Sequence, residues 1–201
     1  MLKKLPCLLF TISMATLAVA SPTATASDGK AKPQPASKTA PAKMEKKSER
    51  AIFAAGCFWK VQYQFSRVPG VIRTRAGYSG GKTQKPSYKE VCTDKTGHAE
   101  VVEIEFDPNK VTYGKLLRMF FTNHNPTTLN RQGLDVGTQY RSAIFCTTTS
   151  QKAQALAFKK QLEDEHRYPA PIVTVIEDAL PFFAAEDYHQ DYFKKHGAVC
   201  N

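Results

Sequence analysis

Residues 51–65 read AIFAAGCFWKVQYQF, and the pattern changes in the middle of this stretch. The first five residues are small or apolar and predict a buried strand, whereas the spacing after Cys57 predicts a helix over 58–66. Cys57 therefore stands where a strand turns into a helix. Free backbone N–H groups and the helix dipole stabilise a thiolate at such a position, so we expect the pKa of Cys57 to be lowered.

Three neighbours of Cys57 support a reactive role for this cysteine. Gly56 is expected to leave space for a substrate beside the sulfur, and Phe58 and Trp59 are expected to form an apolar wall rather than part of the core. The pattern alone leaves a second interpretation open. In that interpretation Cys57 is a buried structural cysteine and Trp59 is an ordinary packing residue.

The first 20 residues have the pattern of a secretory signal peptide. Two lysines precede an apolar stretch over 5–17, and the small-residue sequence AVA stands before Ser21. The stretch is shorter than the roughly 20 residues of a transmembrane helix, so cleavage is favoured over retention as an anchor. We expect residues 1–20, with Cys7, to be removed and the protein to be periplasmic or secreted.

Residues 21–50 are rich in Ala, Pro and Lys and offer little to bury, which predicts a disordered tether before a single domain over 51–201. The formal net charge is +10, and six of these charges lie in the first 50 residues. The domain itself is therefore mildly basic, which argues against a nucleic-acid partner. The basic tether could associate the protein with anionic surfaces of the cell envelope.

Strands and helices alternate along the domain. Strands are predicted at 51–55, 71–78, 98–106, 141–149 and 172–178. Helices are predicted at 58–66, within 108–124 on an apolar stripe that includes Val111, and over 150–167 with Ser150 as the N-cap. A last segment at 184–196 is expected to be helical or irregular. The period of two along 98–106 places His98, Glu100 and Val102 on one face. This order predicts an α+β fold, a two-layer α/β sandwich with a central mixed sheet and a ferredoxin-like core.

Four cysteines follow the signal: Cys57, Cys92, Cys146 and Cys200. In an exported protein they permit two structural disulfides, but their spacings match neither a C-x-x-C pair nor a zinc site. No metal site is therefore expected at these cysteines, and we also expect no bound cofactor. Spacing leaves open whether the cysteines are structural or redox-active.

Several motifs, taken together, resemble the A-type peptide methionine sulfoxide reductases. They are GCFW at 56–59, GYSGG at 77–81, PSYKEVC at 86–92, TGHAEVVEIEFDP at 96–108, QGLDVGTQYRSAIF at 132–145 and YHQDYF at 188–193. The motifs follow the family's order and cover nearly all of residues 51–201. The resemblance implies that the protein reduces the S epimer of methionine sulfoxide, free or in proteins, and thereby repairs oxidised exported proteins.

The resemblance also implies a role for individual residues. Cys57 matches the nucleophile and Glu100 the acid, whose pKa should be raised by burial on its strand. The remaining matches are Phe58 and Trp59 to the wall that binds the substrate methyl, Tyr88 and Tyr140 to the hydroxyls that bind the sulfoxide oxygen, and Asp135 to a carboxylate that orders the polar network. Two residues depart from the family pattern: Lys60 stands where Gly is common, and Leu134 where Asn is common.

The catalytic cycle that the resemblance implies converts Cys57 to a sulfenic acid, which a second cysteine then resolves as a disulfide. Cys200 is the predicted resolving cysteine because it lies near the end of the chain, behind Gly197. Cys92 and Cys146 are expected to pack as small apolar groups, and His98 and His189 to be structural. An external thioredoxin-like thiol carrier would reduce the disulfide, and we expect a monomer.

Two other functions are weighed against this one. A thiol peroxidase or disulfide oxidoreductase also needs a reactive exported cysteine, but it has no need of an acid and two tyrosines around an oxygen. An exported binding domain would instead be stabilised by Cys57–Cys200 and Cys92–Cys146 disulfides.

Overall fold

The computed structural model of the protein describes residues 48–197. Its strands are β1 (Glu49–Ala55), β2 (Val71–Ser79), β3 (Ala99–Phe106), β4 (Arg131–Gln132), β5 (Asp135–Val136), β6 (Ser142–Cys146), β7 (Val175–Asp178) and β8 (Phe183–Ala184). Its helices are α1 (Phe58–Ser66), α2 (Tyr88–Val91), α3 (Tyr113–Asn123), α4 (Thr149–Asp164), α5 (Tyr192–His196) and the 3₁₀ helix η1 (Thr138–Tyr140). The predicted first helix agrees with α1 at both ends.

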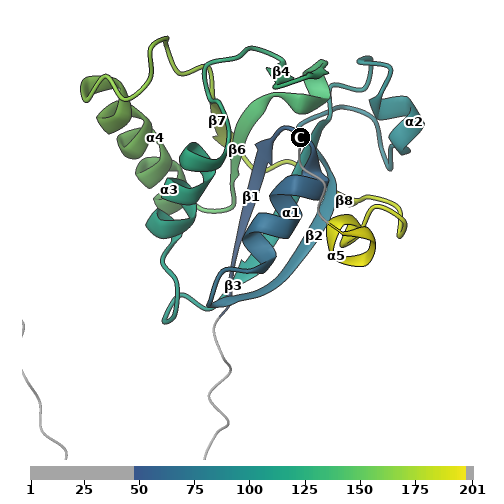
Figure 1. Ribbon diagram of the computed structural model, residues 1–201, viewed down its shortest axis with the longest axis horizontal. Helices are drawn as coiled ribbons and strands as arrows, with labels where there is room; N and C mark the ends of the chain where they lie inside the picture. The colour runs from purple at the N-terminus through teal and green to yellow at the C-terminus, as the bar shows by residue number, and fades with distance from the viewer. Residues whose placement is uncertain (1–47, 198–201) are drawn as a thin grey trace, which may run out of the picture. The chain divides into compact units, whose positions relative to one another are not determined.

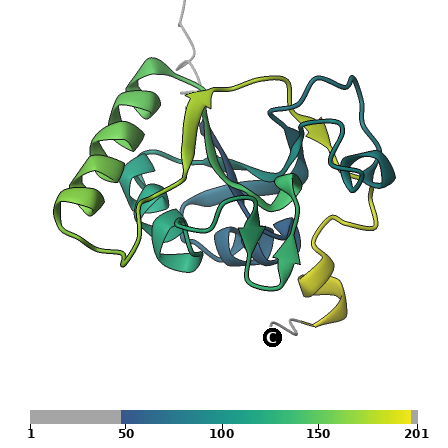
Figure 2. The ribbon, with the colours of Figure 1, turned by 90° about the horizontal axis from the view of Figure 1, so that it is seen from above.

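The strands form a six-stranded sheet in the order β7-β6-β1-β3-β2-β8, and β4 and β5 form a separate hairpin. Only the β6–β7 pair is parallel among the described strands of the large sheet. The four central strands, with α1 and α3 between them in sequence, have the βαββαβ order of a ferredoxin-like core. Helices α1 and α3 lie on one face of the sheet, so the predicted two-layer α+β fold with a mixed sheet is confirmed (Figures 1 and 2).

The larger part of the core lies between the sheet and its helices. Phe53 of β1, Phe65 of α1 and Phe120 of α3 are almost completely buried there, and the Phe53 ring lies 5.5 Å from Phe65 and 5.1 Å from Phe120 between centroids. A smaller cluster on the opposite face, which includes Phe145, packs against Ala179 and Phe182. This packing fixes the end of β1 at which Cys57 lies. Among residues 48–197, no helix combines the length and apolar character that a membrane crossing requires.

The first strand begins two residues earlier than predicted. Glu49 and Arg50 pair with Phe106 and Glu105 of β3, although the composition had placed both in the tether. The ladder with β3 supplies the partners that an isolated polar segment lacks. Predictions for residues 1–20 and for the rest of the tether fall mainly outside the described residues.

Helix α4 and strand β7 also differ from their predictions. Thr148, not Ser150, is the N-cap of α4: its hydroxyl accepts a hydrogen bond from the Gln151 N–H, and Ser150 lies inside the first turn. Strand β7 begins at Val175 rather than at residue 172, because the Val173 N–H bonds to the Pro126 carbonyl instead of a neighbouring strand. Val111 is buried as predicted, but it precedes α3.

Candidate active site

Cys57 occupies the N-cap position of α1, directly after strand β1. The preceding residue, Gly56, has a φ of +87°, and a Cβ there would lie 2.6 Å from the Gln132 Cγ. A side chain at position 56 is therefore excluded by the backbone conformation and by Gln132. Gly56 thus has a structural reason of its own, and the space that it leaves for a substrate stays a prediction.

The Cys57 thiol is held in its protonated form. Burial, followed by the nearby Glu100 carboxyl, raises its pKa to about 12, although backbone N–H groups of Trp59 and Lys60 favour the thiolate. The predicted lowering of this pKa is wrong. The helix N-terminus is present, but desolvation outweighs it, so the free site holds a thiol.

Glu100 projects from β3 toward the same helix N-terminus. Its side chain is buried, and its Oε2 accepts a hydrogen bond from the Phe58 N–H at 3.0 Å. Burial raises the pKa of Glu100 to about 8, against the lowering effect of that hydrogen bond. The carboxyl is therefore mostly protonated near neutral pH and can donate a proton, which agrees with the acid role that the family resemblance implies.

Tyr88 and Tyr140 approach the site from two separate segments. Tyr88 is the first residue of α2 and Tyr140 the last residue of η1. Burial raises both pKa values, that of Tyr140 to about 12, so both hydroxyls remain hydrogen-bond donors. Asp94 joins the two segments, because its Oδ1 accepts hydrogen bonds from the Thr138 N–H and hydroxyl, both at 2.8 Å.

The two predicted wall residues have different environments. Phe58 is 1% exposed and belongs to the core, so the expectation that it lies outside the core is wrong. Trp59 is partly exposed; its ring stacks on Tyr192 at 3.8 Å between centroids, with 9° between the planes. Its indole Nε1–H donates to His189 Nδ1 at 3.0 Å. Trp59 therefore provides the apolar surface that a substrate can reach, and it packs against the core to which Phe58 belongs.

Asp135 lies on the exposed β4–β5 hairpin, next to Leu134, which is 91% exposed. Within residues 48–197 its carboxylate takes part in no hydrogen bond, but its charge contributes to the raised pKa values of Cys57, Glu100 and Tyr140. The structure thus offers a through-space electrostatic effect of Asp135, and its role in ordering a polar network stays a prediction.

Comparison with known proteins identifies the family. The family model described as peptide methionine sulfoxide reductase matches residues 49–201. The chain belongs to this family. It is 54% identical over 153 residues to the peptide methionine sulfoxide reductase MsrA of Methanoculleus marisnigri, an alignment that covers 76% of this chain and 93% of that protein.

Solved structures agree with the family assignment. Reduced Mxr1 from Saccharomyces cerevisiae has 32% sequence identity and a TM-score of 0.72, covering 82% of this chain and 92% of the other. Mxr1 in complex with Trx2 has 22% identity and a TM-score of 0.52, covering 77% and 88%, and shows the fold alone.

The cysteines of this family member differ in environment. Cys57, Cys92 and Cys146 are free thiols in the described part of the chain, which contradicts the Cys92–Cys146 disulfide of a binding domain. Cys146 is buried, as predicted. Cys92 is exposed, so its predicted packing is wrong: it is the C-cap of the short helix α2, where the chain turns to the surface. Cys200 lies outside the described residues.

Sequence reasoning missed one acidic residue behind the site. Glu186 accepts hydrogen bonds from the Tyr88 N–H and the Tyr78 hydroxyl, both at 2.8 Å. It stands just before the YHQDYF motif, and the density of polar residues there was the available signal. His98 is structural, as expected: its ring nitrogens bond to the Gly81 N–H and the Thr83 carbonyl.

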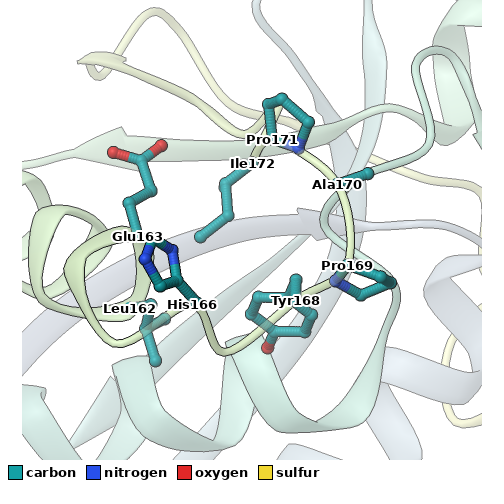
Figure 3. Close-up of a pocket in the computed structure, with 8 residues that line it drawn as sticks. All are labelled: Leu162, Glu163, His166, Tyr168, Pro169, Ala170, Pro171 and Ile172. Atoms are coloured by element: carbon teal, nitrogen blue, oxygen red, sulfur yellow. The ribbon is translucent and has the colours of Figure 1, made fainter.

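A separate cavity of about 410 Å³ lies at the end of α4 (Figure 3). It is lined by Leu162, Glu163, His166, Tyr168, Pro169, Ala170, Pro171 and Ile172. None of these residues belongs to the predicted site, and the group contains no cysteine. The chemistry is therefore assigned to the region around Cys57.

Proposed function

We propose that the protein reduces the S epimer of methionine sulfoxide, free and in polypeptides, to methionine. The observation that carries this proposal is the buried carboxyl of Glu100, which is held protonated beside the Cys57 thiol. A sulfoxide needs a nucleophile at sulfur and a proton donor at oxygen, and this pair supplies both. Family membership supports the same reaction.

In the first step, the Cys57 sulfur attacks the substrate sulfur while Glu100, Tyr88 and Tyr140 donate hydrogen bonds to the sulfoxide oxygen. The oxygen passes to Cys57, so the methionine sulfur gains two electrons and Cys57 becomes a sulfenic acid. The thiol hydrogen is retained on the sulfenic acid, and no net proton is consumed. Because the thiol of the free site is protonated, attack begins only when a bound, polarised sulfoxide is present.

In the second step, Cys200 attacks the sulfenic acid, which gives a Cys57–Cys200 disulfide and water. A thioredoxin-like dithiol then restores both thiols by exchange through a mixed disulfide. Yeast Mxr1, which is 32% identical to this chain in the reduced structure, has also been solved in complex with Trx2, and this supports a carrier of this class. The N-terminal pattern supports a location outside the cytoplasm, where the enzyme, which we expect to be a monomer, would repair oxidised exported proteins.

The test is turnover of the two sulfoxide epimers of a blocked methionine, each supplied separately with a dithiol reductant. The Trp59 wall and the Glu100 acid accommodate one handedness, so the S epimer should react and the R epimer should not. Equal rates on both would contradict the proposal. Efficient consumption of hydrogen peroxide with no sulfoxide reduction would instead indicate a thiol peroxidase.

A second experiment tests the resolving cysteine. Cys200→Ser should still form about one methionine per enzyme without reductant, because the first step does not use Cys200, but turnover with thioredoxin should collapse. Cys92→Ser is the matched control and should turn over as the parent does. If Cys200→Ser keeps full thioredoxin-supported turnover, another thiol resolves the sulfenic acid.

A further inference from the structure

The segment Glu186–Tyr192 contacts both sides of the candidate site. Glu186 fixes the backbone of Tyr88, and Tyr192 stacks on Trp59. Between them in sequence, His189 is 1% exposed and accepts the Trp59 indole N–H. Figure 1 shows α5, which begins at Tyr192, beside α1, which carries Trp59. One short segment therefore positions both Tyr88 and Trp59, the two aromatic residues that are expected to bind the substrate.

The hydrogen bond to Trp59 determines the tautomer of His189. Nδ1 must be unprotonated to accept the indole N–H, so the neutral ring carries its hydrogen on Nε2. Nε2 is buried and has no hydrogen-bond partner among the described residues, and the Glu186 Oε2 lies 4.0 Å away. The nearby carboxylate favours a hydrogen on Nε2. Glu186, which binds the Tyr88 N–H, therefore also stabilises the His189 tautomer that accepts the Trp59 indole N–H.

We propose that His189 is a positioning residue that fixes the rotation of the Trp59 ring, and thereby the surface that receives the substrate methyl. The inference rests on the proposed function, which supplies the substrate. Stacking on Tyr192 fixes the plane of the indole, but a half-turn about the Cβ–Cγ bond would keep that plane and exchange the two edges of the ring. The bond from Nε1 to His189 removes this freedom. His189 has no contact with the sulfoxide oxygen in this scheme and takes part in no proton transfer.

The interaction depends on pH in a defined direction. A protonated His189 carries hydrogens on both nitrogens and cannot accept from the indole. Burial lowers the pKa of His189, while the charge of Glu186 opposes this effect. The titratable groups that face the ring are Glu186, Tyr88 and Tyr188; its other ring contacts are Phe58 and Trp59. The bond should therefore persist at neutral pH and break in acid.

Fluorescence can test the bond without any measurement of activity, because Trp59 is the single tryptophan of the chain. The parent emission should change in one step as acid protonates His189. His189→Asn places an amide oxygen near the position of Nδ1, so it should keep the neutral-pH emission and lose the step. His196→Asn is the matched control, since the His196 ring lies 4.6 Å from the Tyr192 ring between centroids and is not bonded to the indole, and it should retain the step.

Kinetics then test the effect on the substrate. His189→Phe keeps an aromatic ring and removes the acceptor, so KM for the S sulfoxide should rise about three- to tenfold, the usual scale for one hydrogen bond, with little change in kcat. His189→Asn should restore KM to within about twofold of the parent.

The inference is overturned if the acid step survives in His189→Asn, or if His189→Phe and His189→Asn have the same KM. Because His189→Phe could fold poorly, the titration of the parent and of His189→Asn decides the matter independently. Absence of sulfoxide turnover in the parent would refute the proposed function, while the fluorescence would still report whether His189 holds Trp59.

Discussion

Strand β3 carries two buried glutamates whose surroundings are opposite. Glu103 is 3% exposed and is paired with Arg50 and Arg75, with the Arg50 Nη1 at 3.1 Å from its Oε2. Glu100 is 2% exposed and has no cationic partner in the part of the chain that the structure describes. Its polar contact is the Phe58 N–H. Both residues are glutamates on the same strand, and they differ in whether a cationic side chain compensates the negative charge of the carboxylate.

This difference separates a structural carboxylate from a chemical one. A buried charge is tolerated when it is paired, and an unpaired buried carboxyl instead retains its proton. Since the two side chains are three residues apart, they point to opposite faces of the sheet. Glu103 ties the start of β1 and the middle of β2 to β3, whereas Glu100 faces the Cys57 thiol and supplies a proton donor.

The largest effect should come from Glu100→Gln. The amide can still accept the Phe58 N–H but cannot donate a proton, so the reductive step should slow by about 10²- to 10⁴-fold. Methionine formed in a single turnover without reductant measures this step directly. A rate within about threefold of the parent would remove Glu100 from the mechanism.

The free energy of unfolding should depend on pH because the Glu100 carboxyl is buried without a cationic partner. The pKa of Glu100 is about 8 in the folded protein against an ordinary value of 4.5, so the folded state binds the proton more tightly than the unfolded state. Its contribution is therefore fully present below about pH 4.5 and is lost as pH rises through about 8. Relative to Glu100→Gln, the parent should lose on the order of 3–5 kcal/mol of unfolding free energy across this window. Denaturant titrations of both proteins at several pH values measure the difference, and a constant difference would contradict the raised pKa.

Glu103→Gln should give the converse result. Removing the charge leaves two arginines without their buried partner, which should cost about 1–3 kcal/mol of unfolding free energy because both arginines keep some access to water. The single-turnover rate should stay within about threefold of the parent, since this side chain is on the other face. A large loss of rate in a folded variant would show that the two faces are coupled.

The sequence could distinguish these two glutamates only in part. Alternation along 98–106 placed Glu100 on one face with Val102, but a solvated strand glutamate fitted that pattern as well, and it was the motif that favoured a buried acid. The partners of Glu103 could not be predicted, because Arg50 lies in a polar segment that composition assigns to the tether and becomes ordered through pairing with β3.

The same limit applies at Cys57. Its position at the start of α1 follows from local pattern, so the helix boundary was predicted correctly. Its pKa depends on how much of the thiol is desolvated by segments that are distant in sequence, and that property has no local signal. Likewise, the exposure of Cys92 depends on where the short helix α2 ends on the surface.

The smallest effect concerns Asp135, whose charge reaches Glu100 from the exposed hairpin. A like charge raises the pKa of a carboxyl, so Asp135→Asn should lower the pKa of Glu100. The alkaline limb of the single-turnover rate should then move to lower pH. The shift should be a fraction of a pH unit, because water screens the charge of Asp135. The maximal rate below that limb should be nearly unchanged.

High salt should move the alkaline limb of the parent to lower pH as well and reduce the difference between the two proteins, since about 1 M salt screens charges beyond roughly 3 Å. If the carboxylate instead orders the site through hydrogen bonds, the rate should fall at every pH and salt should not reduce the difference. The pH profiles of the two proteins at low and high salt therefore decide whether Asp135 acts on the unpaired Glu100 as a charge or as a hydrogen-bonding group.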